Sequence, residues 1–210
     1  MINKKNVIVT GASGFLGSAF YKYCQDKKWS VRKLNLRGSE KENLRILNCK
    51  DSVIFHFAEE SNPEKYTKGL VSELEKNLLF LVSHSHGKFI YISSIYAKNS
   101  LSKDLYVLHK RKSENWLNQY PFAYVARLGN IIDFNNIKKG SFLYDAKKKL
   151  DLGYDLEECL NFPDSVIYPT NIDFLNSSLE KMICMDGSFY SDIYEKEVKA
   201  IDFVKEVFLN

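Results

Sequence analysis

The sequence predicts an α/β fold: a doubly wound parallel sheet with helices on both faces and a small, abbreviated lobe towards the C-terminal end. Short apolar, β-rich runs alternate with helical patterns over residues 6–128. This alternation favours a parallel sheet whose strands are joined by crossover helices. The first run passes directly into glycines at 11, 14 and 17 and then into a helical pattern, an order that is typical of the opening turn of such sheets.

The first five elements alternate strand and helix. Residues 6–10 form the first strand, and residues 14–27 form a helix. Five apolar residues share one face of this helix at helical spacing: Phe15, Leu16, Ala19, Phe20 and Tyr23. Residues 30–36 form the second strand and a short helix fills 40–47. Residues 52–57, which read Ser-Val-Ile-Phe-His-Phe, form the next strand.

The next four elements continue the alternation. Residues 67–84 form a longer helix with four apolar side chains spaced by four: Leu70, Leu74, Leu78 and Val82. Residues 88–93 are a strand, 106–119 a helix and 122–128 another strand. Right-handed crossovers between these strands predict that a ligand binds at the carboxyl ends of the sheet.

The chain changes character near residue 131. It continues irregularly, contains Pro163 and Pro169, and ends in a helical pattern at 193–208. We expect residues 1–130 to form the sheet domain. Residues 131–210 are expected to form a small lobe that packs on it, because so short a segment buries little core of its own.

The glycine-rich turn indicates a phosphate-binding site. Gly11 allows a sharp turn off the strand, Gly14 lets backbone approach a pyrophosphate, and Gly17 lets the helix pack closely on the sheet. The helix N-terminus then offers free N–H groups and the positive end of its dipole. We expect a dinucleotide to bind here, so that residues 1–130 are a dinucleotide-binding domain. The alternative is an ordinary tight turn between strand and helix.

Composition argues against several other classes of protein. The 210 residues are 45% hydrophobic and 27% charged, with a formal charge of +4. The basic residues are scattered rather than striped, so no nucleic acid is expected as a partner. No apolar run approaches the ~20 residues of a membrane span, and no signal peptide is expected. The four cysteines form no Cys-x-x-Cys pair, which predicts reduced thiols, a cytoplasmic protein and no metal site.

A second group of residues indicates proton-transfer chemistry. Tyr106 and Lys110 lie four positions apart, so a helix places a phenol and an ammonium group on one face. A cation beside a phenol favours the phenolate, which makes a tyrosine a usable acid or base near neutral pH. The pair follows the glycine turn and a strand that ends in Ile92-Ser93-Ser94.

With these residues in place, the chain resembles the short-chain dehydrogenase/reductase superfamily. Within it, the chain is most similar to the extended branch of nucleotide-sugar epimerases, dehydratases and reductases. The resemblance covers roughly residues 5–130. It rests on five segments in the family's order: Thr10 to Gly17, Asp51 to Ala58, Phe89 to Tyr96, Tyr106 to Lys110 with Glu114, and Arg127 to Asn130. It implies a Rossmann-type fold, a nucleotide-sugar substrate, and a homodimer formed through helices 67–84 and 106–119.

The resemblance also implies roles for single residues. Tyr106 would be the catalytic acid or base, and Lys110 would support it and hold the nicotinamide ribose. Ser94 would bond the substrate oxygen, with Ser93 as the neighbouring alternative. The implied cofactor-binding residues are Gly11, Ser13, Gly14, Phe15, Leu16, Gly17, Arg37, Phe57, Ala58, Tyr106 and Lys110.

The end of the second predicted strand favours NADP(H) over NAD(H). Asn35-Leu36-Arg37 lacks the acid that grips the ribose 2′-OH of NAD, and a guanidinium group suits a 2′-phosphate. The family's dehydratases place Thr-Asp-Glu where this chain has Ser93-Ser94-Ile95, so elimination of water is not expected. We expect an NADPH-dependent reductase of a nucleotide-linked 4-keto sugar in polysaccharide biosynthesis, with Tyr106 delivering the proton.

Two other functions stay open. One is a C4 epimerase of the same family, and the other is a dinucleotide-binding regulator without turnover. Only residues 95–105 separate Ser94 from Tyr106, which is short for the family and favours the regulator. The retained Tyr106 and Lys110 favour an enzyme.

Overall fold

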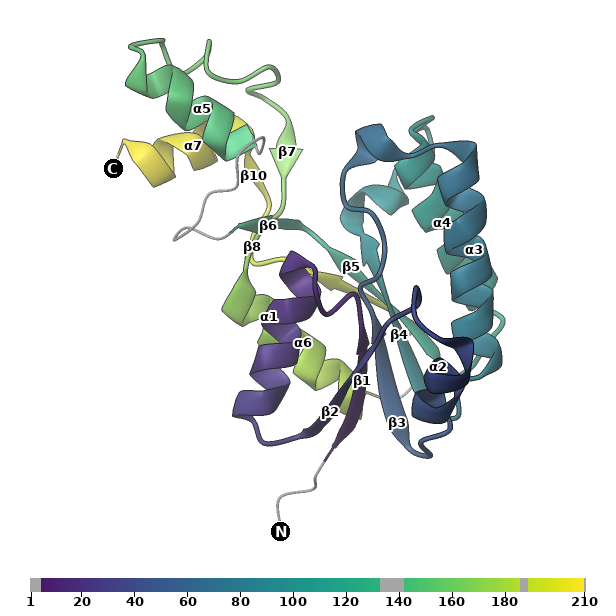
Figure 1. Ribbon diagram of the computed structural model, residues 1–210. Helices are drawn as coiled ribbons and strands as arrows, with labels where there is room; N and C mark the ends of the chain where they lie inside the picture. The colour runs from purple at the N-terminus through teal and green to yellow at the C-terminus, as the bar shows by residue number, and fades with distance from the viewer. Residues whose placement is uncertain (1–4, 133–141, 186–188, 210) are drawn as a thin grey trace. The chain divides into compact units, whose positions relative to one another are not determined.

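The computed structural model describes residues 5–132, 142–185 and 189–209 (Figure 1). The chain divides into two compact units. The first, unit 1, comprises residues 1–127 and 176–192, and the second, unit 2, comprises residues 128–175 and 193–210. The first crossing between units lies close to the boundary predicted near residue 131. Residues 176–192, however, return to unit 1, so a single cut of the chain does not separate the two units.

Unit 1 is built on a six-stranded sheet with the order β2-β1-β3-β4-β5-β9. Its strands are β1 (Asn6–Thr10), β2 (Ser30–Leu34), β3 (Ser52–His56), β4 (Lys88–Ser94), β5 (Ala123–Leu128) and β9 (Tyr190–Ile193). β1 pairs in parallel with both β2 and β3, and β3 pairs in parallel with β4. The predicted α/β fold with a parallel sheet is therefore confirmed.

The helices of unit 1 cover both faces of this sheet (Figure 1). α1 (Phe15–Asp26) lies on one face with the part of α6 (Ile172–Cys184) that belongs to unit 1, and Lys27 and Glu180 form an ion pair of 3.1 Å between them. The other face carries α2 (Glu40–Leu47), α3 (Lys68–Ser83) and α4 (Leu105–Leu117). The faces differ because the chain steps from β1 to β2 in one direction and from β2 to β3 in the other, which gives the doubly wound arrangement.

The core of unit 1 lies between the sheet and α3. Its buried side chains include Ile8, Leu34, Ile54, Leu78, Leu81, Val82, Phe89, Tyr91 and Val125. Three of the four residues in the predicted apolar stripe, Leu74, Leu78 and Val82, are buried in this chain. A second copy would therefore have to contact other residues of α3, and the homodimer stays a prediction.

Unit 2 is a smaller assembly of strands and helices with a core of its own. β6 (Asn130–Ile132) pairs in parallel with β8 (Pro169–Asn171), and β7 (Val166–Ile167) pairs antiparallel with β10 (Val198–Lys199). α5 (Phe142–Asp151) and α7 (Ala200–Phe208) complete it. The buried residues of this core include Ile132, Leu143, Ala146, Cys159, Ile167, Ala200, Phe203 and Val204.

The predicted elements up to Leu128 are confirmed to within two residues at each end, whereas the predicted helix at 193–208 is wrong in its first part. Residues Tyr190–Ile193 form β9 at the edge of the large sheet, β10 follows, and the helix begins only at Ala200. The apolar residues before Ala200 match a helical spacing, but pairing with distant strands decides their conformation.

Candidate active site

The glycine turn joins β1 to α1 and brings two backbone segments into contact. Gly11 has a φ of +66°, and a Cβ atom on it would lie 2.7 Å from the backbone nitrogen of Ala58. The hydroxyl of Thr10 accepts a hydrogen bond from the same nitrogen at 3.2 Å. Only glycine fits at position 11, because the backbone there is left-handed and a Cβ atom would clash with the backbone of residues 57 and 58. Phe57 and Ala58 therefore lie against the turn, beside the residues predicted to bind phosphate.

No side chain caps the N-terminus of α1. Gly14 is its N-cap, donates its N–H to the carbonyl oxygen of Gly11 at 2.9 Å, and supplies no side chain to the first turn of the helix. A Cβ atom on Gly17 would overlap the carbonyl oxygen of Gly11, so the helix can start this close to the strand only with glycine there. Ser13, Gly14 and Phe15 are exposed, and Leu16 is half-buried. Uncapped N–H groups at a helix start suit a phosphate.

Arg37 follows the carboxyl end of β2. Its backbone N–H donates to the side-chain oxygen of Asn35 at 3.1 Å, which shapes the turn after the strand. The Arg37 side chain is exposed and forms no hydrogen bond or ion pair within the described part of the chain. Its guanidinium group is therefore available to an anionic ligand.

A buried carboxylate that the sequence analysis did not single out lies after β3. The side chain of Glu59 is 4% exposed, and its Oε2 accepts from the Nζ of Lys110 at 2.6 Å. The same oxygen accepts from the hydroxyl of Tyr91 at 3.1 Å, while Oε1 lies 3.3 Å from the Nε2 of His109. The Nε2 of His56 is 3.7 Å from Oε1. These five residues form the Glu59 cluster.

Glu59 stays charged despite its burial. Burial alone would raise the pKa of its carboxyl, but the charge of Lys110, the hydrogen bond of His109 and the nearby ring of His56 hold this pKa well below its usual range. His56 is itself held from its other side, because its Nδ1 lies 2.7 Å from the hydroxyl of Thr10. The cluster thus connects the end of β1 to α4 through buried side chains.

Tyr106 and Lys110 share one face of α4, as the sequence predicts. Asp104 caps the helix by accepting from the backbone N–H of Tyr106 at 2.7 Å. The Nζ of Lys110 lies 5.8 Å from the centre of the Tyr106 ring. It also donates to the carbonyl oxygen of Ile92 at 2.7 Å, and the Lys110 side chain is 6% exposed. The ammonium group is therefore bound by Glu59 and backbone beneath the phenol.

Tyr66 lies beside Tyr106. The two rings meet edge to face at 5.2 Å between centres, and the Tyr66 hydroxyl donates to the carbonyl oxygen of Glu60 at 2.8 Å. Burial raises the pKa of the Tyr66 phenol, and the nearby carboxylate of Glu59 adds to this effect. Tyr66 is therefore a neutral packing partner, which leaves Tyr106 as the half-buried phenol of the pair.

The two serines at the end of β4 have different partners. Ser93 donates to Oε1 of Glu114 at 2.6 Å, and Glu114 is also held by Arg127, whose Nε lies 3.1 Å from both carboxylate oxygens. The Ser94 oxygen instead accepts from the backbone N–H of Tyr96 at 3.3 Å. Among the described residues, no acceptor binds the hydroxyl hydrogen of Ser94. This contrast favours Ser94 over Ser93 for contact with a substrate oxygen.

Two other features, a metal site and a membrane span, are absent from the described residues. No group of three or more His, Cys, Asp and Glu side chains among them could hold a metal ion, and none of their helices is long and apolar enough to cross a membrane.

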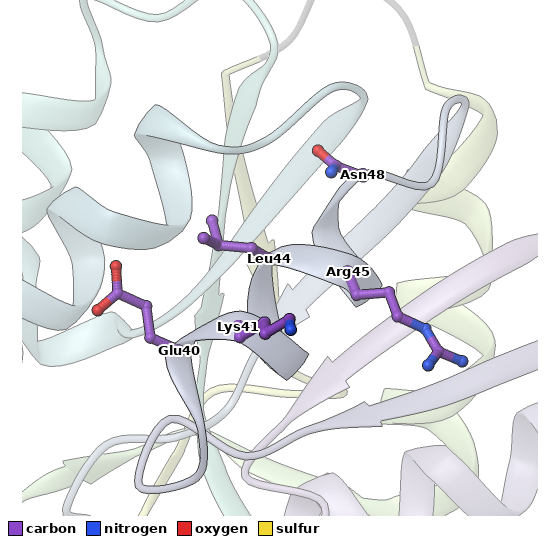
Figure 2. Close-up of a pocket in the computed structure, with 5 residues that line it drawn as sticks. All are labelled: Glu40, Lys41, Leu44, Arg45 and Asn48. Carbon is purple, nitrogen blue, oxygen red and sulfur yellow. The ribbon is translucent and has the colours of Figure 1, made fainter.

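Figure 2 shows a hollow on the surface of α2, lined by Glu40, Lys41, Leu44, Arg45 and Asn48. All of these belong to one helix and its C-cap, and the charged ends of Glu40 and Arg45 point apart, so no polar groups converge as in a ligand site.

Comparison with solved structures shows which fold this chain has. No family model and no curated protein matches the sequence. Among solved structures, dTDP-4-dehydrorhamnose reductase from Bacillus anthracis, in complex with NADP, is 16% identical with a TM-score of 0.74 over 100% of this chain and 81% of that one. RMD from Pseudomonas aeruginosa, complexed with NADPH, is 16% identical with a TM-score of 0.73 over 96% and 80% of the two chains. UDP-N-acetylglucosamine 4-epimerase from Bacillus cereus is 16% identical with a TM-score of 0.75 over 97% and 80%.

These similarities define the class of fold to which the chain belongs. It has a Rossmann-type fold that is similar to the fold of these three structures, as the sequence predicts. At 16% identity the similarity shows the fold, whereas the activity depends on the residues of the site.

Proposed function

We propose that this protein is an NADPH-dependent reductase of a nucleotide-linked 4-keto sugar. The observation that carries the proposal is the grouping, within unit 1, of an open glycine turn with Ser94 and Tyr106 at the carboxyl edge of one parallel sheet. In open α/β sheets, ligands bind at this edge, where the strand order reverses. A serine and a tyrosine that face a carbonyl group there can bind and protonate its oxygen.

The turn suits the phosphates of a dinucleotide. The missing Cβ atoms of Gly11 and Gly17 allow the strand, the turn and the helix to come together, and the N–H groups at the start of α1 have no side-chain cap. Arg37 would bind the 2′-phosphate that distinguishes NADP from NAD. NADP and NADPH are present in two of the similar structures, which supports the same choice for this chain. When bound, the coenzyme would supply the hydride.

The chain's own residues would handle the proton. Ser94 would donate a hydrogen bond to the keto oxygen and orient it. The Tyr106 hydroxyl would give its proton to the same oxygen as the carbonyl carbon is reduced, so that the ketone becomes an alcohol. The phenolate left behind would be stabilised by Lys110 below it and would regain a proton from water.

Each of two other functions has one observation in its favour. A C4 epimerase is supported by the similar structure of an epimerase of UDP-N-acetylglucosamine. A dinucleotide-binding regulator without turnover is supported by the contact between Lys110 and Glu59, because an ammonium group that is already paired is less available to a ligand. The end of β2 carries Arg37 and no acid, which favours NADPH over NAD. We favour the reductase because a reductase consumes one NADPH at each turnover and then exchanges it.

The reductase is tested by mixing the protein with NADPH and a panel of 4-keto nucleotide sugars while NADPH absorbance is followed. We expect NADPH to be consumed with at least one member of the panel and one alcohol to form for each NADPH oxidised. Interconversion of sugar epimers without net loss of NADPH would support the epimerase. Binding of NADPH without change in any sugar would support the regulator.

Replacing Arg37 by alanine tests the choice of coenzyme. The variant loses the charge proposed to pair with the 2′-phosphate, so its affinity for NADPH should fall about tenfold, the typical value of one charge-assisted contact. Its affinity for NADH should not change. Calorimetric titration with NADPH and with NADH measures the ratio of the two affinities. Arg45→Ala, on the exposed surface of α2, is the matched control. Equal losses for NADPH and NADH would mean that Arg37 does not bind the 2′-phosphate.

A further inference from the structure

We propose that Glu59 is a built-in competitor for Lys110, and that it limits how tightly the nicotinamide half of a dinucleotide binds. This inference rests on the proposed function and on the role that the family resemblance implies for Lys110, which is to hold the nicotinamide ribose. It concerns a residue that lies outside the glycine turn and outside the Ser94 and Tyr106 pair. Glu59 and Lys110 are in direct contact, with 2.6 Å between the carboxylate oxygen and the ammonium nitrogen.

The geometry leaves Lys110 little capacity for a ligand. An ammonium group has three N–H donors. One is directed to Glu59 at 2.6 Å and a second to the carbonyl oxygen of Ile92 at 2.7 Å. The side chains of Lys110 and Glu59 are only 6% and 4% exposed. The third N–H donor remains, but so little of either side chain is exposed that a ribose hydroxyl can reach the ammonium group only if the contact with Glu59 loosens.

The carboxylate of Glu59 is held in place by side chains from β3, β4 and α4. His56 approaches from β3, Tyr91 donates from β4, and His109 approaches from α4, while Tyr66 packs against His109 with ring centres 5.9 Å apart. Glu60, the next residue, turns instead to Lys65, with 3.3 Å between the charged atoms. Glu59 is thus the carboxylate aimed at Lys110, and its neighbour in sequence is a natural comparison.

Chemistry decides which partner Lys110 prefers. A hydrogen bond to a carboxylate is about twice as strong as one to a neutral hydroxyl, so a ribose does not displace Glu59 without cost. When the binding-competent state is only a fraction of the population, the apparent affinity falls by that fraction.

The experiment compares two ligands on two matched variants. Glu59→Gln keeps the size of the side chain and removes its charge, and Glu60→Gln makes the same change one residue away. Each protein is titrated calorimetrically with NADPH and with adenosine 2′,5′-bisphosphate, which represents the adenine half alone. We expect Glu59→Gln to bind NADPH about tenfold more tightly than the wild type and to bind the adenine half unchanged. Glu60→Gln should behave as the wild type with both ligands.

A third variant assigns the gain to Lys110. In Glu59→Gln combined with Lys110→Met, the gain in NADPH affinity should disappear, because no ammonium group is left to be released. Unfolding or damage cannot produce tighter binding, and unchanged affinity for the adenine half verifies that the variants are folded. The proposal is overturned if NADPH binds Glu59→Gln no more tightly than the wild type, or if Glu60→Gln shows the same gain. If the wild type binds neither ligand, the proposed function fails and this inference fails with it.

Discussion

Replacing Tyr106 by phenylalanine is expected to lower the rate of keto-sugar reduction by about 100- to 10,000-fold, the range that a general acid contributes. The change removes one hydroxyl and leaves the ring, so the edge-to-face contact with Tyr66 and the helix cap from Asp104 should persist. NADPH affinity should stay within about twofold of the wild type, because the glycine turn that we propose to bind phosphate is untouched. The measurement is NADPH consumption under saturating substrate, with calorimetric titration of NADPH beside it.

Tyr66→Phe is the matched control for this variant. It removes the same group from the neighbouring ring, whose hydroxyl donates to the carbonyl oxygen of Glu60. We expect it to lose about 1 kcal/mol of unfolding free energy through this hydrogen bond and to keep most of its turnover. If Tyr106→Phe turned over at the wild-type rate, or if both variants lost activity equally, Tyr106 would not be the proton donor.

Replacing Gly14 by valine is expected to weaken NADPH binding by about a hundredfold, the loss of two charge-assisted hydrogen bonds to phosphate. The backbone at Gly14 is extended, with φ −81° and ψ 168°, a conformation that valine adopts readily. A Cβ atom there would meet only the carbonyl oxygen of Gly11, at 3.3 Å. The side chain would instead occupy the space in front of the first turn of α1.

The fold of this variant should survive, with a loss of about 1 kcal/mol or less for a poorer N-cap residue. Thermal unfolding followed by circular dichroism measures that loss. Gly69→Val is the matched control, since Gly69 lies in α3 and a Cβ atom on it would come no closer than 3.9 Å to Thr67. It should bind NADPH as the wild type does. Full NADPH affinity in Gly14→Val would mean that phosphate does not bind at this turn.

Much of unit 1 can be predicted because its signals are local. Each strand up to Leu128 is a short apolar run, and each helix carries its own periodic face, so neighbours in sequence suffice to recognise them. The glycine turn is equally local, since Gly11, Gly14 and Gly17 act within seven positions. β9 is different, because its residues become a strand only by pairing at the edge of the sheet beside β5.

The Glu59 cluster could not be predicted, because its members come together only in the folded chain. Tyr91 lies 32 positions and His109 lies 50 positions from Glu59. The one available signal was an acidic residue directly after an apolar strand end, at Ala58-Glu59. The choice between Ser93 and Ser94 has the same origin, since the contact of Ser93 with Glu114 spans 21 positions. Sequence spacing identified both serines and could not distinguish their partners.

Calorimetric titration of the wild-type chain with NADPH tests most directly whether a dinucleotide binds at the turn between β1 and α1. We expect saturable binding of one NADPH per chain that is tighter than the binding of NADH and about a hundredfold weaker in Gly14→Val. Absence of heat and of binding with both coenzymes, or binding that Gly14→Val leaves intact, would contradict it.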